Sequence, residues 1–531
     1  MTDRQKKLAL AAVVVAAATA VSRVVGLARE VLTAGYYGVD PNINTLISVS
    51  VVPNLVRQLV ADAAVSAAFV PVITGLLVKG DADRARRLAG NLLGFMLVVV
   101  GAVCLVAIAV ALPLMHLIYP HLTRDAHAQL LAAHILQILM PTVLVLAVGG
   151  VVTGVLYSHE RFTMPAVVSI VWNLVIIGFI IFAHRQLGVY AIAWGTLAGT
   201  GLELLLLLAT ARAAGVGLSL HFDFRDPLLR QVLVLMVPIT ITLGILNFNA
   251  LVDTFFAQFV NNRAAAEIAY SFRIYQLPQG IFAVTIGTIL FPSLSRFAAI
   301  GESDRFRETL SMGVRQMMFV SLPFVAWFAL LPRPFVQLIY QRGAFGGLAT
   351  HDVAAALAGF TAGLAFANAN IMFNRGFQSL KRPWLPLYAA LVNLALNAVL
   401  DWVLLGPLGV AGITLSTSIV SACNFAVLVW LMRRQIGRVD GRRIVRALAG
   451  ALVCAAVLLG VSWGVWRGLQ GVAAHGFVAL AVCVLATVAA GAVAYVGIAK
   501  ALGLEELTLV WRALRRRAPG GGAGVPGAVG S

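Results

Sequence analysis

Residues 8–35 read LALAAVVVAAATAVSRVVGLAREVLTAG, a run of 28 residues in which the only charges are two arginines and one glutamate. A helix that crosses the hydrocarbon core of a bilayer needs about 20 predominantly apolar residues, so this run predicts a membrane-spanning helix. The start before it, Met-Thr-Asp-Arg-Gln-Lys-Lys, has the charge of a signal peptide. Because the run continues past Arg23 without a convincing cleavage site, we interpret it as a retained first span.

The whole chain has the composition of a polytopic membrane protein. Of its 531 residues, 60% are hydrophobic and 11% are charged, and the mean hydropathy is +0.93. Soluble globular chains carry about 25% charged residues, which excludes an ordinary soluble enzyme. Polar breaks separate fourteen apolar segments, and the fold class predicted is all-α and integral to the membrane. The segments lie near 8–35, 44–78, 88–118, 128–156, 163–183, 189–211, 229–260, 266–295, 308–340, 351–374, 384–405, 409–432, 447–466 and 474–499.

The net charge of +18 arises from 39 Lys+Arg against 21 Asp+Glu. With fourteen spans, 29 of the basic residues fall on one side of the membrane and 6 on the other. Since cytoplasmic loops are enriched in Lys and Arg, this bias predicts that both termini are cytoplasmic. No nucleic-acid partner is needed to explain the charge. The remaining four cations lie inside spans: Arg23, Arg29, Arg57 and Arg273.

Two stretches about 221 residues apart resemble each other. One begins at Gly154 and continues through Asn173 to Leu187-Gly-Val, and the other begins at Gly376 and continues through Asn393 to Leu408-Gly-Val. A duplication of six helices gives two parallel lobes around a central cavity, as in transporters that work by alternating access. The predicted parts are lobes 1–213 and 214–440, two extra helices in 441–503, and a basic segment with a disordered Gly/Ala/Pro tail in 504–531.

An arginine at mid-bilayer depth costs at least about 2.5–3.5 kcal/mol on insertion scales, so the four arginines should face a wet cavity or have partners. One alternative is an internal ion pair, such as Arg29 with Glu30 or Asp62. These two acids cannot neutralise all four cations. Because guanidinium groups bind phosphate through several donors, we infer an anionic, phosphorylated substrate. Flanking residues assigned to gating or pairing are Ser22, Gly26, Glu30, Asp62 and Gln276.

A second polar set lies in the C-terminal half. Asp253 lies in the seventh predicted span, and Asn393 and Asn397 share one helix face in the eleventh. Carboxylate and amide oxygens suit a small cation such as Na⁺, or the acid carries a proton. The alternative is that the asparagines form interhelical hydrogen bonds. Glu203 and Asp401 are interpreted as solvated ends of spans.

Four motifs, in this order along the chain, resemble the MurJ (MviN) family of lipid II flippases, within the superfamily of multidrug and polysaccharide exporters (MOP, MATE-like). They are Ser22-Arg-Val-Val-Gly-Leu-Ala-Arg-Glu30, Pro53-Asn-Leu-Val-Arg57, Ala68-Phe-Val-Pro71 and Gly287-Thr-Ile-Leu-Phe-Pro-Ser-Leu-Ser295. The resemblance implies a fourteen-helix protein of the bacterial inner membrane, without enzymatic activity, with two six-helix lobes around a cavity and a lipid-tail groove on the last two helices.

The resemblance also implies the substrate and its contacts. The substrate would be lipid II, moved from the cytoplasmic to the periplasmic leaflet for peptidoglycan synthesis and cell shape, with membrane lipids and cell-wall synthesis proteins as partners. Arg23, Arg29, Arg57 and Arg273 would bind it. A cation site would fall at Asp253, Asn393, Asn397 and Thr414, and Na⁺, H⁺ or the membrane potential would drive the cycle without any other cofactor.

The chain departs from the family pattern at three positions. Asn44 stands where relatives have Asp, Gln58 where many have Arg, and Gln276 where relatives have an acid. The lost acids keep two alternatives open: a flippase for another polyprenyl-pyrophosphate-linked glycan, or a transport-inactive scaffold for cell-wall synthesis. An enzyme is disfavoured, because the sequence shows no paired catalytic carboxylates and no HExxH motif.

Overall fold

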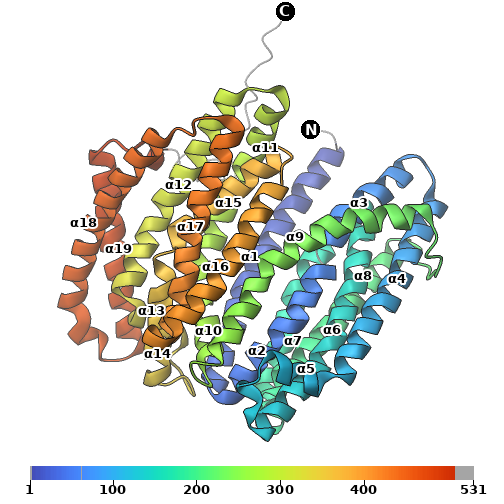
Figure 1. Cartoon of the computed structure of the whole chain (residues 1–531), viewed down its shortest axis with the longest axis horizontal. Coiled ribbons are helices and arrows are strands. Elements are labelled where there is room, and N and C mark those ends of the chain that lie inside the picture. The colour runs from blue at the N-terminus through green and yellow to red at the C-terminus, as the bar shows by residue number, and fades with distance from the viewer. Residues whose placement is uncertain (1–2, 61–62, 509–531) are drawn as a thin grey trace, which may run out of the picture. The chain divides into compact units, whose positions relative to one another are not determined.

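The computed structural model describes residues 3–60 and 63–508, and in these ranges every regular element is helical (Figure 1). The all-α fold class is therefore confirmed. Asp62 and the predicted tail beyond residue 508 lie outside the described residues. The helices are α1 (Asp3–Tyr37), α2 (Pro41–Val60), α3 (Ala63–Val78), α4 (Ala82–Ala109), α5 (Ala111–Ile118), η1 (Leu122–Arg124), α6 (Ala126–Ser158), α7 (Thr163–Leu187), α8 (Tyr190–Ala213), α9 (Pro227–Ala257), α10 (Ala264–Pro278), η2 (Gln279–Ala283), α11 (Val284–Ile300), α12 (Ser303–Leu330), α13 (Pro332–Tyr340), α14 (Gly347–Thr361), α15 (Leu364–Ser379), α16 (Trp384–Leu408), α17 (Val410–Ile436), α18 (Gly441–Ala473) and α19 (Phe477–Ala501).

Each of the fourteen predicted apolar segments coincides with one helix or with consecutive helices. Nine helices of the described ranges are long and apolar enough to span a membrane, or ten if the bent pair α14–α15 is one span. The other segments are broken or more polar. The segment 266–295, for example, is divided into α10, the π-helical turn η2 and α11, directly after Pro278. Proline removes a backbone donor and clashes with the preceding turn, which explains the break.

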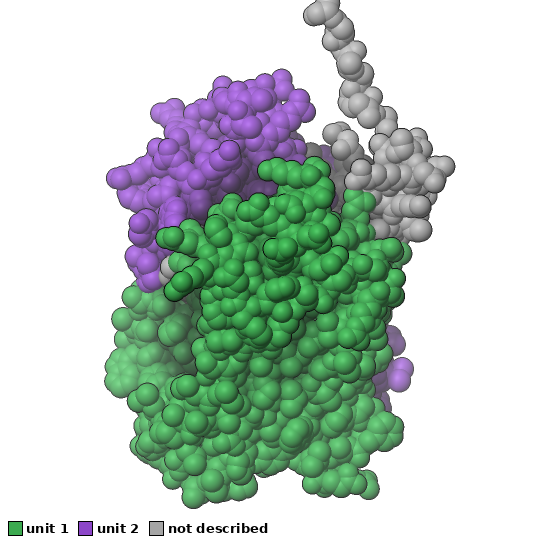
Figure 2. Space-filling view, turned by 90° about the vertical axis from the view of Figure 1, so that its right-hand side faces the viewer, with its two compact units in different colours: residues 1–271, 339–356, 394–413 green, residues 272–338, 357–393, 414–531 purple. Residues whose placement is uncertain are grey.

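The chain forms two compact units, coloured separately in Figure 2. Unit 1 comprises Met1–Ser271, Ile339–Ala356 and Leu394–Ile413, and unit 2 comprises Phe272–Leu338, Leu357–Asn393 and Thr414–Ser531. The lobe boundaries at 213, 440 and 503 stay predictions.

In unit 1, α6 is the central helix, since it contacts α2, α3, α4, α5 and α8, while α7 packs between α1 and α8. Close packing depends on small residues: a Cβ at Gly199 would meet Trp172, and one at Gly195 would meet Phe179. Apolar side chains gain little from contacting each other rather than lipid, so membrane helices associate through close backbone approach of this kind.

In unit 2, the central helix is α12, which contacts α11, α15, α18 and α19. In its most apolar window 72% of residues are buried, against 28% in α18 and α19. Polar contacts fix the last two helices to it: the Tyr495 hydroxyl donates to the Phe319 carbonyl at 2.8 Å, and Trp327 Nε1 donates to Ser462 Oγ at 3.3 Å. Arg315 on α12 forms a partly buried ion pair with Glu506, with 2.6 Å between Nη1 and Oε1.

The bend between α14 and α15, 49° in size, is stabilised by one side chain. Ser418 of α17 donates its hydroxyl to the Gly359 carbonyl at 2.7 Å and accepts a hydrogen bond from the Gly363 amide at 2.9 Å. The Gly359 carbonyl and the Gly363 amide would bond each other in a continuous helix, and at the break the Ser418 hydroxyl bonds both of them instead. Backbone polar groups within a membrane need such a partner inside the protein. A Cβ at Gly363 would lie 2.6 Å from the Ser418 Cα, so only glycine allows this approach.

We expect Gly363→Ala to destabilise the protein, because the added methyl group would force α17 away from the bend. The thermal midpoint in detergent, followed by size-exclusion fluorescence, should fall by several degrees. Gly460→Ala is the matched control, since a Cβ at Gly460 of α18 meets nothing within 4 Å and alanine favours helix by up to about 1 kcal/mol. Equal midpoints for the two variants would contradict the role given to Gly363.

Candidate functional site

The four arginines predicted to lie inside spans are on three helices. Arg23 and Arg29 are on α1, Arg57 is in the last turn of α2, and Arg273 is on α10. Arg23 and Arg273 are exposed, whereas Arg29 and Arg57 are partly buried. The first three belong to unit 1 and Arg273 belongs to unit 2. A common site formed by all four stays a prediction.

Arg29 is held in one orientation by two contacts. Its Nη2 lies 2.6 Å from Glu30 Oε1, and its guanidinium carbon lies 4.9 Å from the centroid of the Trp172 ring on α7. Trp172 is fixed in turn, because its Nε1 donates to Thr200 Oγ1 at 3.2 Å. The Arg29 and Glu30 side chains are only 16% and 18% exposed. Of the two acids predicted as partners, Glu30 is therefore the one that the described residues place on Arg29.

The residues predicted to serve in gating or pairing lie on α1 and α10. Gly26 faces α7, where an added Cβ would lie 3.7 Å from Asn173 Oδ1. Ser22 on α1 and Gln276 on α10 are partly buried. Asn173 itself is 6% exposed and donates to the Ser169 carbonyl at 2.8 Å.

Asn44, where the family pattern predicts an acid, has a structural function here. The side chain is 2% exposed, and its Oδ1 accepts a hydrogen bond from the Ala266 amide at 3.1 Å. The first four amides of a helix have no partner within the helix, and Ala266 is in the first turn of α10. An amide oxygen satisfies such a donor as well as a carboxylate does, without a charge to bury.

The C-terminal end of α1 contacts the loop between α13 and α14, and both belong to unit 1. The Ala344 amide donates to the Gly35 carbonyl at 2.8 Å. A Cβ on Gly343 would collide with the Gly35 carbonyl, and one on Gly38 with the Ala344 carbonyl. Both glycines have positive φ, +55° at Gly343 and +61° at Gly38, so the backbones meet only where side chains are absent.

Three aromatic side chains fill the space beside this contact. The ring centroids of Tyr270 and Tyr340 are 5.1 Å apart, and Phe345 lies 5.6 Å from each of them. All three are at most 1% exposed. The Tyr340 hydroxyl donates to the Tyr270 carbonyl at 3.3 Å. We call Gly35, Gly38, Gly343, Ala344 and these three rings the closure cluster. The sequence reasoning missed it, since no local pattern joins residues 35 and 343.

The predicted cation site is partly assembled. Asn397 Nδ2 donates to Asp253 Oδ1 at 2.9 Å and to Asp401 Oδ2 at 2.7 Å. Asn397 and Asp401 are fully buried. The interpretation of Asp401 as a solvated end was therefore wrong. It lies one turn after Asn397 on α16, and that i, i+4 spacing was the signal that could have identified it.

Two other predicted ligands are placed differently. Asn393 Nδ2 donates to Asn424 Oδ1 of α17 at 2.6 Å, which is the interhelical hydrogen bond considered as an alternative. Thr414 is fully buried at the start of α17. Both residues belong to unit 2, whereas Asp253, Asn397 and Asp401 belong to unit 1.

The donor set in unit 1 suits a hard cation. Asn397 Oδ1 is buried and accepts no hydrogen bond from the described residues, so an oxygen acceptor is left beside two carboxylates. Oxygen ligands of this kind are those that small hard cations prefer. No group of three or more His, Cys, Asp or Glu side chains that could hold a metal ion occurs in the part of the chain that the structure describes.

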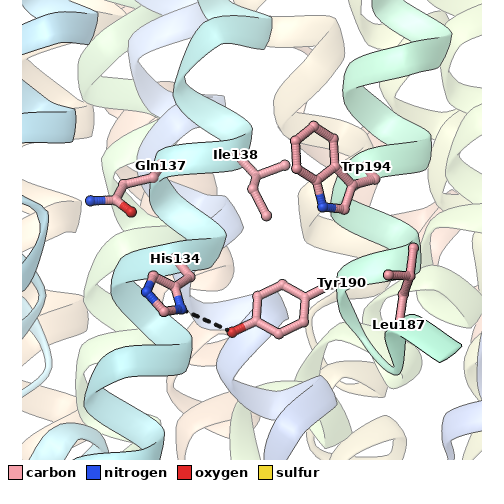
Figure 3. A pocket seen from close by; sticks show the side chains of 6 residues that line it. All are labelled: His134, Gln137, Ile138, Leu187, Tyr190 and Trp194. Carbon is pink, nitrogen blue, oxygen red and sulfur yellow. Dashed lines mark hydrogen bonds between the residues drawn. The ribbon is translucent and has the colours of Figure 1, made fainter.

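A surface pocket of about 400 Å³ lies elsewhere in unit 1, between α6 and the start of α8 (Figure 3). It is lined by His134, Gln137, Ile138, Leu187, Tyr190 and Trp194. His134 Nδ1 and the Tyr190 hydroxyl are 3.3 Å apart. Tyr and Trp at the ends of spans are typical of the membrane interface. No arginine lines this pocket, so it is separate from the predicted substrate contacts.

Comparisons with known proteins agree along nearly the whole chain. The family model described as "Lipid II flippase MurJ" matches residues 33–484. The "Probable lipid II flippase MurJ" of Rhizobium meliloti (strain 1021) is 28% identical over 520 residues, covering 95% of this chain and 96% of the relative. The "Lipid II flippase MurJ" of Burkholderia cenocepacia is 27% identical over 425 residues, covering 79% of this chain and 82% of the relative.

Solved structures show the same fold. The structure of "Lipid II flippase MurJ, inward closed conformation" matches with a TM-score of 0.78 at 20% identity, covering 95% of this chain and all of that one. An inward-facing multidrug-resistance transporter of the MATE family, in the MOP superfamily, matches with a TM-score of 0.67 at 14% identity, covering 79% of this chain and 96% of that one. Since the family model spans most of its length, this chain belongs to the MurJ family of lipid II flippases.

Proposed function

We propose that this protein moves lipid II, the lipid-linked precursor of peptidoglycan, from the cytoplasmic to the periplasmic leaflet by alternating access. The observation that carries the proposal is the family match over residues 33–484. The activity is transport and needs no covalent step. The proposal assigns residues 1–213 and 214–440 to two lobes and 441–503 to a groove for the polyprenyl tail.

The proposal places the protein in the bacterial inner membrane with both termini in the cytoplasm. With fourteen spans, 29 basic residues lie on the side of the two termini and 6 on the opposite side. This bias supports the orientation, because cytoplasmic loops are enriched in Lys and Arg. Proteins of cell-wall synthesis are proposed as partners, because they make and consume the transported lipid.

In this proposal Arg23, Arg29, Arg57 and Arg273 bind the pyrophosphate. The contacts of Arg29 support this role: Glu30 at 2.6 Å and Trp172 at 4.9 Å restrain its guanidinium in the absence of substrate. A guanidinium carries five N–H donors, more than a single carboxylate uses, so a paired arginine can also donate to a phosphate oxygen. Restraining the side chain beforehand lowers the entropy lost on binding.

We expect Arg23→Ala, Arg57→Ala and Arg273→Ala each to abolish complementation of a strain depleted of its own lipid II flippase. Loss of one hydrogen bond to a charged group costs about 1.5–3 kcal/mol, or roughly 10- to 100-fold in transport rate. Transport is measured with labelled lipid II in proteoliposomes by an accessibility assay. Arg185→Ala, at an exposed position in the last turn of α7, is the control. Wild-type growth of the three variants would refute the assignment.

The second element of the proposal is a Na⁺ site formed by Asp253, Asn397 and Asp401. Asn393 and Thr414, which the sequence also predicts as ligands, are proposed as further ligands. Two carboxylates that share one amide donor repel each other, and a cation between them relieves the repulsion. Bound Na⁺ would supply positive charge at this position. Proton binding at Asp253 and the membrane potential are the alternative driving forces.

Na⁺ should stabilise the wild-type protein relative to choline at equal ionic strength. At ten times the dissociation constant the stabilisation is about 1.4 kcal/mol, visible as a higher thermal midpoint in detergent. Asp401→Asn and Asp253→Asn should remove this increase. Asp83→Asn, with a side chain 81% exposed, should keep it. A midpoint that responds to pH but not to Na⁺ would exclude the cation and favour the proton.

We propose that the closure cluster opens and closes during the alternating-access cycle. We expect Gly343→Val to abolish complementation, since a Cβ there collides with the Gly35 carbonyl and a β-branched residue is strained at φ +55°. Gly346→Val is the control, because a Cβ at Gly346 meets nothing within 4 Å. Accessibility of a cysteine introduced at Tyr340 to a membrane-impermeant thiol reagent should rise in the Gly343 variant. Unchanged accessibility would contradict the gating role.

A further inference from the structure

The segment that joins α8 to α9 has an alternating pattern that the proposed function does not use. Residues 216–223 form no helix. Apolar side chains occupy Leu218, Leu220, Phe222 and Phe224, and polar ones occupy Ser219, His221 and Asp223 between them. A period of two in an extended chain directs the two sets to opposite sides.

The backbone of the segment lies against α4. The His221 amide donates to the Gly90 carbonyl at 3.2 Å, and the Asp223 amide donates to Asn91 Oδ1 at 3.1 Å. An added Cβ on Gly90 would collide with the Ser219 carbonyl, and one on Gly94 with the His221 carbonyl. The two glycines therefore form a groove along α4 that receives the backbone of the segment.

Asn91 also fixes the start of the next helix. Its Nδ2 donates to Asp226 Oδ2 at 2.9 Å, while Asp226 Oδ1 accepts from the Leu228 amide at 2.9 Å and caps α9. Asn91 is 3% exposed. These hydrogen bonds hold the extended segment to α4 and to the start of α9.

Three of the four apolar side chains are exposed, whereas Leu218 is partly buried and packs against the core of unit 1. Leu220, Phe222 and Phe224 are 51%, 57% and 46% exposed. In water this orientation would be unfavourable by about 25 cal/mol for each Å² of apolar surface left exposed. The orientation is favourable only where acyl chains meet the surface. Figure 1 shows the segment running beside α4, whose apolar window has a mean hydropathy of 2.9.

Its position along α4 corresponds to the edge of the bilayer. Gly90 and Gly94 lie 8 and 12 residues after the first residue of α4, Ala82, or about 12 and 18 Å along the helix axis. Exposed arginines precede this level on α4, and exposed apolar side chains follow it. They are Arg84, Arg86 and Arg87 before it, and Leu97, Val98 and Val99 after it.

The charges around the segment favour anionic lipid. Arg212, Arg225 and Arg230 are exposed at its two ends. Of the nearby acids, Asp226 bonds Asn91 and caps α9, and the exposed Asp223 accepts a hydrogen bond from the Arg225 amide at 3.1 Å, so the three arginines outnumber the acids at the surface. Each basic residue close to an anionic surface contributes about 1 kcal/mol of attraction.

We propose that residues 216–224 are an interfacial lipid-binding strip. Leu220, Phe222 and Phe224 insert beside the acyl chains of the leaflet, and the flanking Arg212, Arg225 and Arg230 bind the headgroups of anionic phospholipids. The strip holds the start of α9 at a fixed depth in the membrane.

Spin-label accessibility tests the depth of the strip. Three of the four natural cysteines are buried and Cys423 is partly buried, so a Cys423→Ser background suffices for labelling in nanodiscs that contain phosphatidylglycerol. Labels at Leu220→Cys and Phe222→Cys should resemble a label at Val98→Cys, with high accessibility to oxygen and low accessibility to a water-soluble nickel chelate. A label at Asp83→Cys should show the reverse.

Labels at 220 and 222 that behave like the label at 83 would overturn the proposal. Labels shielded from both reagents would overturn it in favour of a covering protein. The Arg225→Gln/Arg230→Gln variant tests headgroup binding: the immobilised fraction of spin-labelled phosphatidylglycerol should fall toward that of phosphatidylcholine, whereas wild type should prefer phosphatidylglycerol at least threefold. Equal fractions in wild type would refute anionic selectivity.

Discussion

A polar group inside a membrane-spanning segment must find its partner within the protein, because lipid offers none. This constraint explains the most unusual contacts in the molecule. Ser418 bonds both sides of the bend between α14 and α15, Asn44 satisfies an amide of α10, and Asn397 bonds two acids at once. In each of these three places one side chain completes hydrogen bonds that the helix itself leaves open. The sites proposed for substrate and cation lie among these same spans.

Much of the fold could be predicted from the sequence, because the requirement for spanning helices is local. Runs of apolar residues locate the helices, and Pro278 marks the break in the eighth segment. The composition of the two units could not be predicted. Unit 1 takes Ile339–Ala356 from far along the chain, through contacts such as Ala344 with Gly35 that depend on shape rather than on any sequence pattern.

The candidate sites show the same division between local and long-range information. Arg29 and Glu30 are neighbours in sequence and pair in the structure. The sequence predicts a solvated Asp401, because an acid near the end of an apolar run usually is. In the structure Asn397 Nδ2 donates both to Asp401 and to Asp253 of α9. Asn393 has the spacing of a ligand but bonds Asn424 on the next helix. Which neighbour a buried polar side chain meets is decided by helix packing, which one sequence does not encode locally.

The closure cluster has a consequence for how this chain can vary. Its central contact joins backbone atoms of Gly35, Gly343 and Ala344, so this contact depends on how small these residues are, while the Tyr340 hydroxyl adds a hydrogen bond beside it. A contact between backbone atoms carries no charged side chain, so neither salt nor protonation alters it directly. A substitution that adds a side chain at one of these glycines therefore disturbs the contact more than a change of charge nearby.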